Sequence, residues 1–129
     1  DALPIFIGAR LIEDGSAARI IEIQKQELRQ RQAILSEILG RYDVQSQPIA
    51  THAWLRLPEP WRGAGFARTC LERGVAVLPG DAFAVGREPV QHGVRINVGA
   101  ARSQEDLRTA LTIMAELLSA GHLQLPGFV

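Results

Sequence analysis

Two short stretches decide the fold: THAWLRL at residues 51–57 and GVRINVG at residues 93–99. In both, apolar residues alternate with polar or aromatic ones, which is the period of a β-strand with one buried face. The positions predicted to face the core are Ala53, Leu55, Leu57, Val94, Ile96 and Val98. The positions predicted to face outward are His52, Trp54, Arg56, Arg95 and Asn97. We therefore expect two strands with an apolar inner face and a polar, aromatic outer face.

A long helix is predicted over about residues 16–39, with Ser16 as its N-cap and Gly40 as its end. Its apolar positions recur with heptad spacing at Ile21, Leu28 and Leu35. The side predicted to be polar consists of Arg19, Glu22, Lys25, Gln26, Arg29, Gln30, Arg31 and Gln32. So narrow an apolar stripe is typical of a long helix that packs against another domain, although an ordinary amphipathic helix with a solvated face has the same pattern.

The remaining elements alternate between helices and strands. They are a helix over 2–13, a loop over 42–50, a helix ending near Arg73, a buried strand over 75–78 and a helix from Ser103 to Gly121. The inner face of the middle helix is predicted to consist of Phe66, Ala67, Cys70 and Leu71. Ser103 followed by Asp106 is a capping signature. This order predicts an α+β fold, a small and mostly antiparallel sheet with helices on one face, in which residues 51–121 supply the sheet and its helices.

Length and composition predict a single domain spanning residues 1–129. Fourteen basic and fourteen acidic residues balance, which argues against nucleic-acid binding by this chain. No apolar run approaches the roughly 20 residues of a membrane span. Because the chain starts at Asp1 and not at methionine, we expect it to be a piece of a larger cytoplasmic protein, although a processed or tag-cleaved start would look the same.

Three weaker motifs point to no site. Gly63-Ala64-Gly65 begins like a dinucleotide fingerprint, but Arg68 stands where the third glycine would allow close helix–strand packing. The three histidines, His52, His92 and His122, fall in separate elements without metal-ligand spacing. Cys70 is the only cysteine, and its place on an inner helix face is typical of a small buried hydrophobe. We therefore predict no nucleotide site, no metal site and no cysteine nucleophile.

The outward face of the two alternating strands is the remaining candidate site. A guanidinium fixed in mid-strand, as at Arg95, is well suited to hold a carboxylate, because the strand removes much of the entropy cost of positioning it. A solvated sheet face has the same residue pattern. The residues by themselves leave both interpretations open.

The order of several short motifs resembles a known family. Gly74–Val77, Pro79–Phe83, Val94–Gly99 and the helix from Ser103 resemble the end of a fold-type I pyridoxal-phosphate protein, an aminotransferase-like chain. Ile12–Gly15, Arg31-Gln32 and His52–Pro58 resemble more narrowly the MocR subgroup of GntR-type transcription regulators. Those proteins join an N-terminal winged-helix DNA-binding domain to an aminotransferase-like effector domain, and the chain would be the C-terminal small domain of the latter.

The resemblance implies roles for a few residues. Arg95 matches the arginine that binds the α-carboxylate of substrate or effector, with Trp54, Asn97 and Phe83 as neighbours on the site face. Pyridoxal 5′-phosphate is expected in the complete protein and not in this chain, because the Schiff-base lysine and phosphate contacts belong to the large domain. Lys25, the only lysine here, is predicted on the polar side of a helix. Ala50-Thr51 replaces a family glycine, so the ligand preference can differ.

These implications give one leading function and two alternatives. We expect the chain to help a regulator bind a small amine or amino-acid-like effector, with DNA contacted only by a separate N-terminal domain. In the complete protein, the large domain and a second subunit of a homodimer would complete the site, and no membrane is involved. The alternatives are the small domain of a working aminotransferase and a stand-alone interaction module.

Overall fold

A computed structural model describes residues 15–80 and 92–124, with side chains described as far as Gly121. The elements are α2 (Ser16–Leu39), β1 (Asp43–Gln45), β2 (His52–Arg56), α3 (Gly63–Glu72), β3 (Leu78–Pro79), β4 (Gly93–Asn97) and α4 (Gln104–Gln124). The predicted bounds of the long helix are confirmed. The helix expected over 2–13 lies outside the described residues.

The sheet has four strands in the order β1-β2-β4-β3, and every neighbouring pair is antiparallel. At its centre, Ala53 of β2 stands opposite Ile96 of β4, and Trp54 stands opposite Arg95. Ala53 and Ile96 are buried, whereas Arg95 is exposed. The predicted α+β class and the two faces of the central strands are therefore confirmed.

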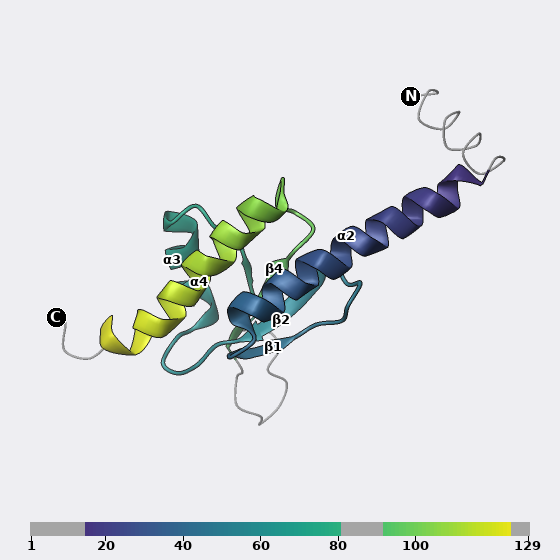
Figure 1. Ribbon diagram of the computed structural model, residues 1–129. Coiled ribbons are helices and arrows are strands. Elements are labelled where there is room, and N and C mark those ends of the chain that lie inside the picture. The colour runs from purple at the N-terminus through teal and green to yellow at the C-terminus, as the bar shows by residue number, and fades with distance from the viewer. Residues whose placement is uncertain (1–14, 81–91, 125–129) are drawn as a thin grey trace.

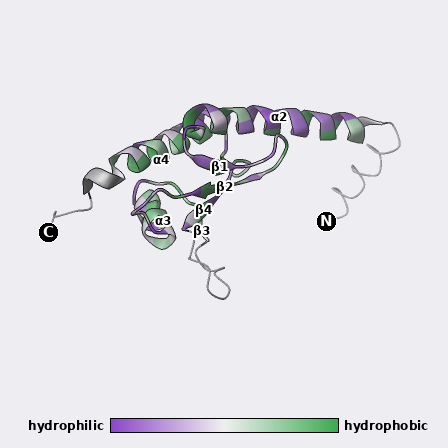
Figure 2. Ribbon diagram, turned by 90° about the horizontal axis from the view of Figure 1, so that it is seen from below, coloured by the Kyte–Doolittle hydropathy of each residue, from purple (hydrophilic) through white to green (hydrophobic). Residues whose placement is uncertain are grey.

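The helices cover the apolar face of the sheet. The second half of α2 lies beside α4 (Figure 1), the two helices pack against each other, and Figure 2 shows them extending in opposite directions from this contact. The core joins the three helices to β2 and β4 and contains Ile34, Leu35, Leu39, Ala53, Leu55, Phe66, Cys70, Val94, Ile96, Val98, Leu107, Leu111, Met114 and Leu118. Full burial of one such leucine contributes about 1.5–3 kcal/mol, so this cluster holds the helices on the sheet.

The first half of α2 extends beyond the sheet and the other helices (Figure 1). Its isoleucines Ile20, Ile21 and Ile23 are 39%, 51% and 67% exposed. Only the second half of α2 reaches the core, through Leu35 and its neighbours. The apolar stripe predicted from Ile21 to Leu35 is thus buried at one end only.

Three predictions about α2 and α4 need revision. Gly15, at φ 79°, is the N-cap of α2, and Ser16 is the first residue of the helix. Arg31 and Gln32, predicted on the polar side, are buried because their side chains hydrogen-bond backbone carbonyls. α4 does not end at Gly121 but continues to Gln124. The predicted cap at Ser103 is confirmed, since its Oγ accepts the Asp106 amide at 3.0 Å.

The chain before β3 and the segment after α2 also differ from prediction. The buried strand expected over 75–78 is instead an exposed strand at Leu78–Pro79, because the Val75 amide still bonds the Cys70 carbonyl at the end of α3. The loop expected over 42–50 contains β1, which adds an edge to the sheet. Leu71, predicted on the inner face of α3, is 65% exposed.

Candidate functional site

The outward face of β2 and β4 brings together most of the residues predicted for the site. His52 stands opposite Asn97, and Trp54 stands opposite Arg95, in adjacent antiparallel strands. His52, Asn97 and Arg95 are exposed, and Trp54 is partly buried. Phe83, the fourth predicted residue, lies outside the described residues. Two neighbouring strands thus hold Arg95, Asn97 and Trp54 on one surface of the sheet.

A small cavity opens on this surface. It has a volume of about 130 Å³ and is lined by His52, Ala76, Val77, Leu78, Arg95 and Asn97. Leu78 of β3 is the sheet partner of Arg95, so three strands and the segment before β3 form the walls. A cavity of this size fits one small polar group, such as a carboxylate, rather than a whole ligand of about 300 Å³ or more.

The guanidinium of Arg95 differs from that of its neighbour Arg56 in having no partner among the described residues. Across residues 15–80 and 92–124, no side-chain hydrogen bond or ion pair involves it. Arg56, on the same face of β2, instead pairs with Asp43 of β1 at 3.4 Å. Of these two arginines on neighbouring strands, Arg95 is therefore the one whose planar set of donors has no ion-pair partner among the described residues.

Trp54 occupies its place because two glycines make room for it. A Cβ atom added to Gly93 would lie 2.7 Å from Cε2 of Trp54 and 2.8 Å from its Cη2. A Cβ added to Gly80 would meet the same ring. The indole therefore lies against bare backbone of β4 and of the residue after β3. Sequence reasoning missed these glycines, although glycine next to an alternating strand is a known sign of close approach.

Asn97 shapes the end of β4 as well as lining the cavity. Its Oδ1 accepts the Gly99 amide at 2.9 Å, which closes the turn after the strand. Nearby, Thr51 Oγ1 and His52 Nδ1 are 3.0 Å apart, so the imidazole is anchored to its own strand. The orientation of both side chains on the site face is thus set by short local contacts.

A larger hollow, of about 480 Å³, lies between α4 and the segment before β3. Its lining includes the apolar residues Val75, Ile96 and Met114 and the arginines Arg73 and Arg102. Arg73 is already paired with Glu116 at 3.1 Å. It shares Ala76, Val77 and Asn97 with the small cavity, so the two hollows are neighbours, but Arg95 lines only the smaller one.

The described residues do not fit a complete pyridoxal-phosphate site. The cavity beside Arg95 has no lysine in its lining, and Lys25 lies on α2. Burial raises the pKa of the Cys70 thiol to about 11, which makes it a poor nucleophile near neutral pH. Within the described part of the chain, no cluster of histidine, cysteine or acidic residues is arranged to hold a metal.

Comparison with known proteins places this fold. The chain resembles the multiple substrate aminotransferase of Thermococcus profundus, with TM-score 0.68 and 21% identity over 90% of the chain. It resembles LysN, the α-aminoadipate aminotransferase of Thermus thermophilus, with TM-score 0.67 and 22% identity over 90% of the chain. A probable N-succinyldiaminopimelate aminotransferase, also of Thermus thermophilus, is 31% identical over 70% of the chain, with TM-score 0.57. The chain has an aminotransferase-like fold.

The aminotransferase-like domain also resembles a protein of another class. The HTH-type transcriptional regulator YdeF of Bacillus subtilis is 27% identical to it over 110 residues, which cover 85% of the chain. No protein-family profile matches the chain. The domain spans 24% of the length of that regulator and 24–30% of the three aminotransferases above. Among its described helices, none has the length and apolar character needed to cross a membrane.

Proposed function

We propose that this aminotransferase-like domain is the C-terminal part of the effector region of a GntR/MocR-type transcription regulator, and that Arg95 binds the carboxylate of an amino-acid-like effector. The observation that carries the proposal is the Arg95 guanidinium in mid-strand, which no side chain of the described residues pairs with, at the wall of a cavity that fits a carboxylate. The likeness to an HTH-type regulator supports the regulator class.

Neighbouring residues would refine the recognition of such an effector. Trp54 lies on the strand next to Arg95 and offers an apolar ring, while Asn97 adds polar groups along the same cavity wall. A charge-assisted pair between guanidinium and carboxylate gives direction as well as energy, because both groups are planar. We include Phe83 in the proposed site only on the strength of the family resemblance.

The proposal assigns the other parts of the site to the rest of a longer cytoplasmic protein. There, a large domain would hold pyridoxal 5′-phosphate, a second subunit of a homodimer would complete the site, and a separate helix-turn-helix domain would contact DNA. In this arrangement residues 1–129 form one domain. Its zero net charge agrees with a chain that does not itself bind DNA.

A second candidate is the small domain of a working aminotransferase. The solved relatives favour it, since each is described as an aminotransferase, and LysN is described in complex with N-(5′-phosphopyridoxyl)-L-leucine. The outward face around Arg95 would serve a substrate carboxylate in the same way as an effector carboxylate. The two candidates differ in what the complete protein does after binding.

Two measurements on the complete protein test the proposal. In calorimetric titrations, N-(5′-phosphopyridoxyl)-L-leucine is expected to bind about tenfold to a hundredfold more tightly than the matching adduct without the carboxylate. In a mobility-shift assay, the protein is expected to bind duplex DNA from its own promoter. Equal affinity for both adducts would refute the carboxylate site. Repeated amino-group transfer without DNA binding would favour the aminotransferase.

A further inference from the structure

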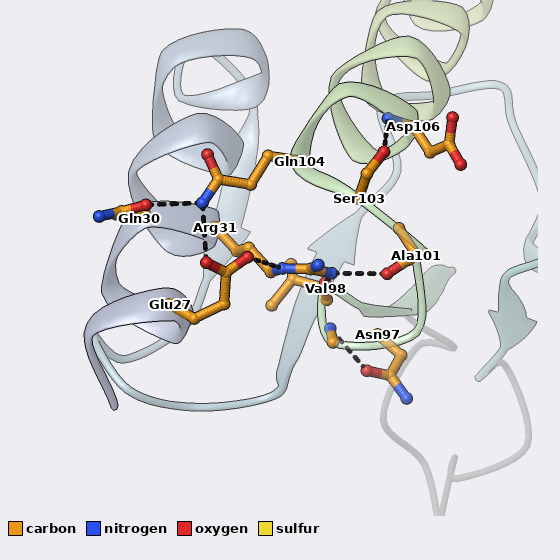
Figure 3. Close-up of polar contacts among 10 residues, drawn as sticks. Glu27, Gln30, Arg31, Asn97, Val98, Ala101, Ser103, Gln104 and Asp106 are labelled. Carbon is orange, nitrogen blue, oxygen red and sulfur yellow. Dashed lines mark hydrogen bonds and ion pairs between the residues drawn. The ribbon is translucent and has the colours of Figure 1, made fainter. Parts of the chain in front are cut away.

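A buried arginine of α2 holds the turn that follows β4. Arg31 is 8% exposed, and its Nη1 donates hydrogen bonds to the carbonyls of Val98 at 2.9 Å and Ala101 at 2.8 Å. Its Nε donates to Glu27 one helical turn earlier, at 2.8 Å (Figure 3). One guanidinium thus binds both sides of the turn and a carboxylate on its own helix.

The start of α4 is fastened to the same group of side chains. Gln104 Nε2 donates to Glu27 at 3.0 Å and to Gln30 at 2.6 Å, as Figure 3 shows. The hydrogen bond from Arg31 lowers the pKa of Glu27. Near neutral pH this carboxylate is therefore ionised and accepts hydrogen bonds from both Arg31 and Gln104. The turn between β4 and α4 is therefore bound to α2 at its centre and just beyond its end.

The other side of this turn belongs to the proposed binding site. Asn97 lines the cavity beside Arg95, and its Oδ1 accepts the Gly99 amide inside the turn (Figure 3). The next residue, Val98, carries the carbonyl that Arg31 binds. A shift of the turn would therefore move Asn97 directly, and Arg95 through the shared strand.

We propose that Arg31 is a positioning residue, which fixes the turn after β4 and through it sets the orientation of Asn97 and Arg95 toward their ligand. This inference rests on the proposed function and adds a coupling to α2, whose first half extends away from the domain (Figure 1). Two carbonyls and a carboxylate arranged around one side chain require the planar, forked guanidinium. A lysine ammonium cannot reach all of them in the same geometry.

The test compares three variants of the complete protein. Arg31→Lys removes the planar guanidinium but keeps the positive charge. Gln104→Ala removes the hydrogen bonds from the start of α4 to Glu27 and Gln30 and leaves no unpaired charge in the interior. Arg108→Lys is the matched control, because Arg108 also joins α4 to α2, through Glu37 at 2.5 Å, but on the exposed surface. Hydrogen–deuterium exchange reports the opening of residues 97–103, and titration with the two phosphopyridoxyl adducts reports binding.

In Arg31→Lys, amides of the turn are expected to exchange about tenfold faster or more, while the strands of the core keep their protection. Affinity for the adduct with the carboxylate is expected to fall about twofold to thirtyfold, while affinity for the adduct without it stays unchanged. Gln104→Ala should change both readouts in the same direction, and Arg108→Lys should change neither.

Other results would overturn the inference. Faster amide exchange throughout the domain, with an equal loss of affinity for both adducts, would show that Arg31 only stabilises the fold. Unchanged exchange at residues 97–103 in Arg31→Lys would show that the turn does not depend on it. If the wild-type protein did not distinguish the adducts, the proposed function would fail, and the exchange of the turn would still decide whether Arg31 holds it.

Discussion

The substitution Gly93→Ala would place a methyl group where the Trp54 indole lies. The added Cβ would be 2.8 Å from Cη2 and nearer still to other ring atoms. Ordinary carbon–carbon contacts begin at about 3.5 Å, so even that atom would have to move by roughly 0.7 Å. Because the indole is the free end of a side chain on an open face, we expect the ring to swing away and the strand to stay in place.

The size of the effect follows from two opposing contributions. Displacing a packed side chain typically costs about 1–3 kcal/mol, and replacing a strand glycine by alanine returns about 0.5 kcal/mol through the unfolded chain. The net loss is therefore about 0.5–2.5 kcal/mol. For a domain of this size, that corresponds to a fall in melting temperature of roughly 2–10 °C.

The assay uses protein labelled with 5-fluorotryptophan, whose two tryptophans, Trp54 and Trp61, give separate ¹⁹F resonances. In Gly93→Ala, the Trp54 resonance should move and the Trp61 resonance should not. Gly65→Ala in α3 is the matched control, because a Cβ there meets nothing within 4 Å, and it should leave both resonances in place with equal or higher stability. An unmoved Trp54 resonance in Gly93→Ala, together with unchanged melting, would refute the reasoning.

Three further predictions concern stability. Because burial raises the Cys70 pKa from its ordinary 9.0 to about 11, the free energy of unfolding should fall as pH rises from about 9 to 11, and urea titrations of Cys70→Ala should lack that fall. Ser103→Ala should lower the unfolding free energy by about 1 kcal/mol in the same assay, and an equal loss in Ser16→Ala would contradict the capping assignment. Because Ile20, Ile21 and Ile23 are exposed, we expect weak self-association of the 129-residue chain, and replacing the three by glutamine should reduce it in sedimentation velocity; a large drop in melting temperature would show that these residues are not on a free surface.

Local pattern was sufficient for the elements that position the site. β2 and β4 alternate strictly, and a one-residue slip would turn Leu55 out of the core, so their faces could be predicted. The bounds of α2 follow from Gly15 and Gly40, the glycines that flank its two ends. β1 has only three residues, too few for an alternation to stand out from a loop.

Long-range contacts account for what local pattern missed. Arg31 has the spacing of a solvated helix residue, but the carbonyls that bury it lie 67 and 70 positions later in the chain. The position of the Trp54 ring likewise depends on Gly93, in β4, and on Gly80, the residue after β3. A polar residue can look exposed in its own helix when its hydrogen-bond partners belong to a distant turn. Such partners appear only once the sheet is assembled.

The central claim is that Arg95 recognises a carboxylate, and the most direct test compares Arg95→Ala with Arg56→Ala in the complete protein. Both arginines are exposed on the same face of neighbouring strands, but Arg56 is already paired with Asp43. The measured quantity is the ratio of affinities for the phosphopyridoxyl adducts with and without the carboxylate, recorded alongside melting temperature. Arg95→Ala is expected to reduce this ratio about tenfold to a hundredfold, with unfolding free energy changed by no more than about 0.5 kcal/mol, while Arg56→Ala keeps the ratio. A ratio that survives in Arg95→Ala, or falls equally in both variants, would contradict the claim.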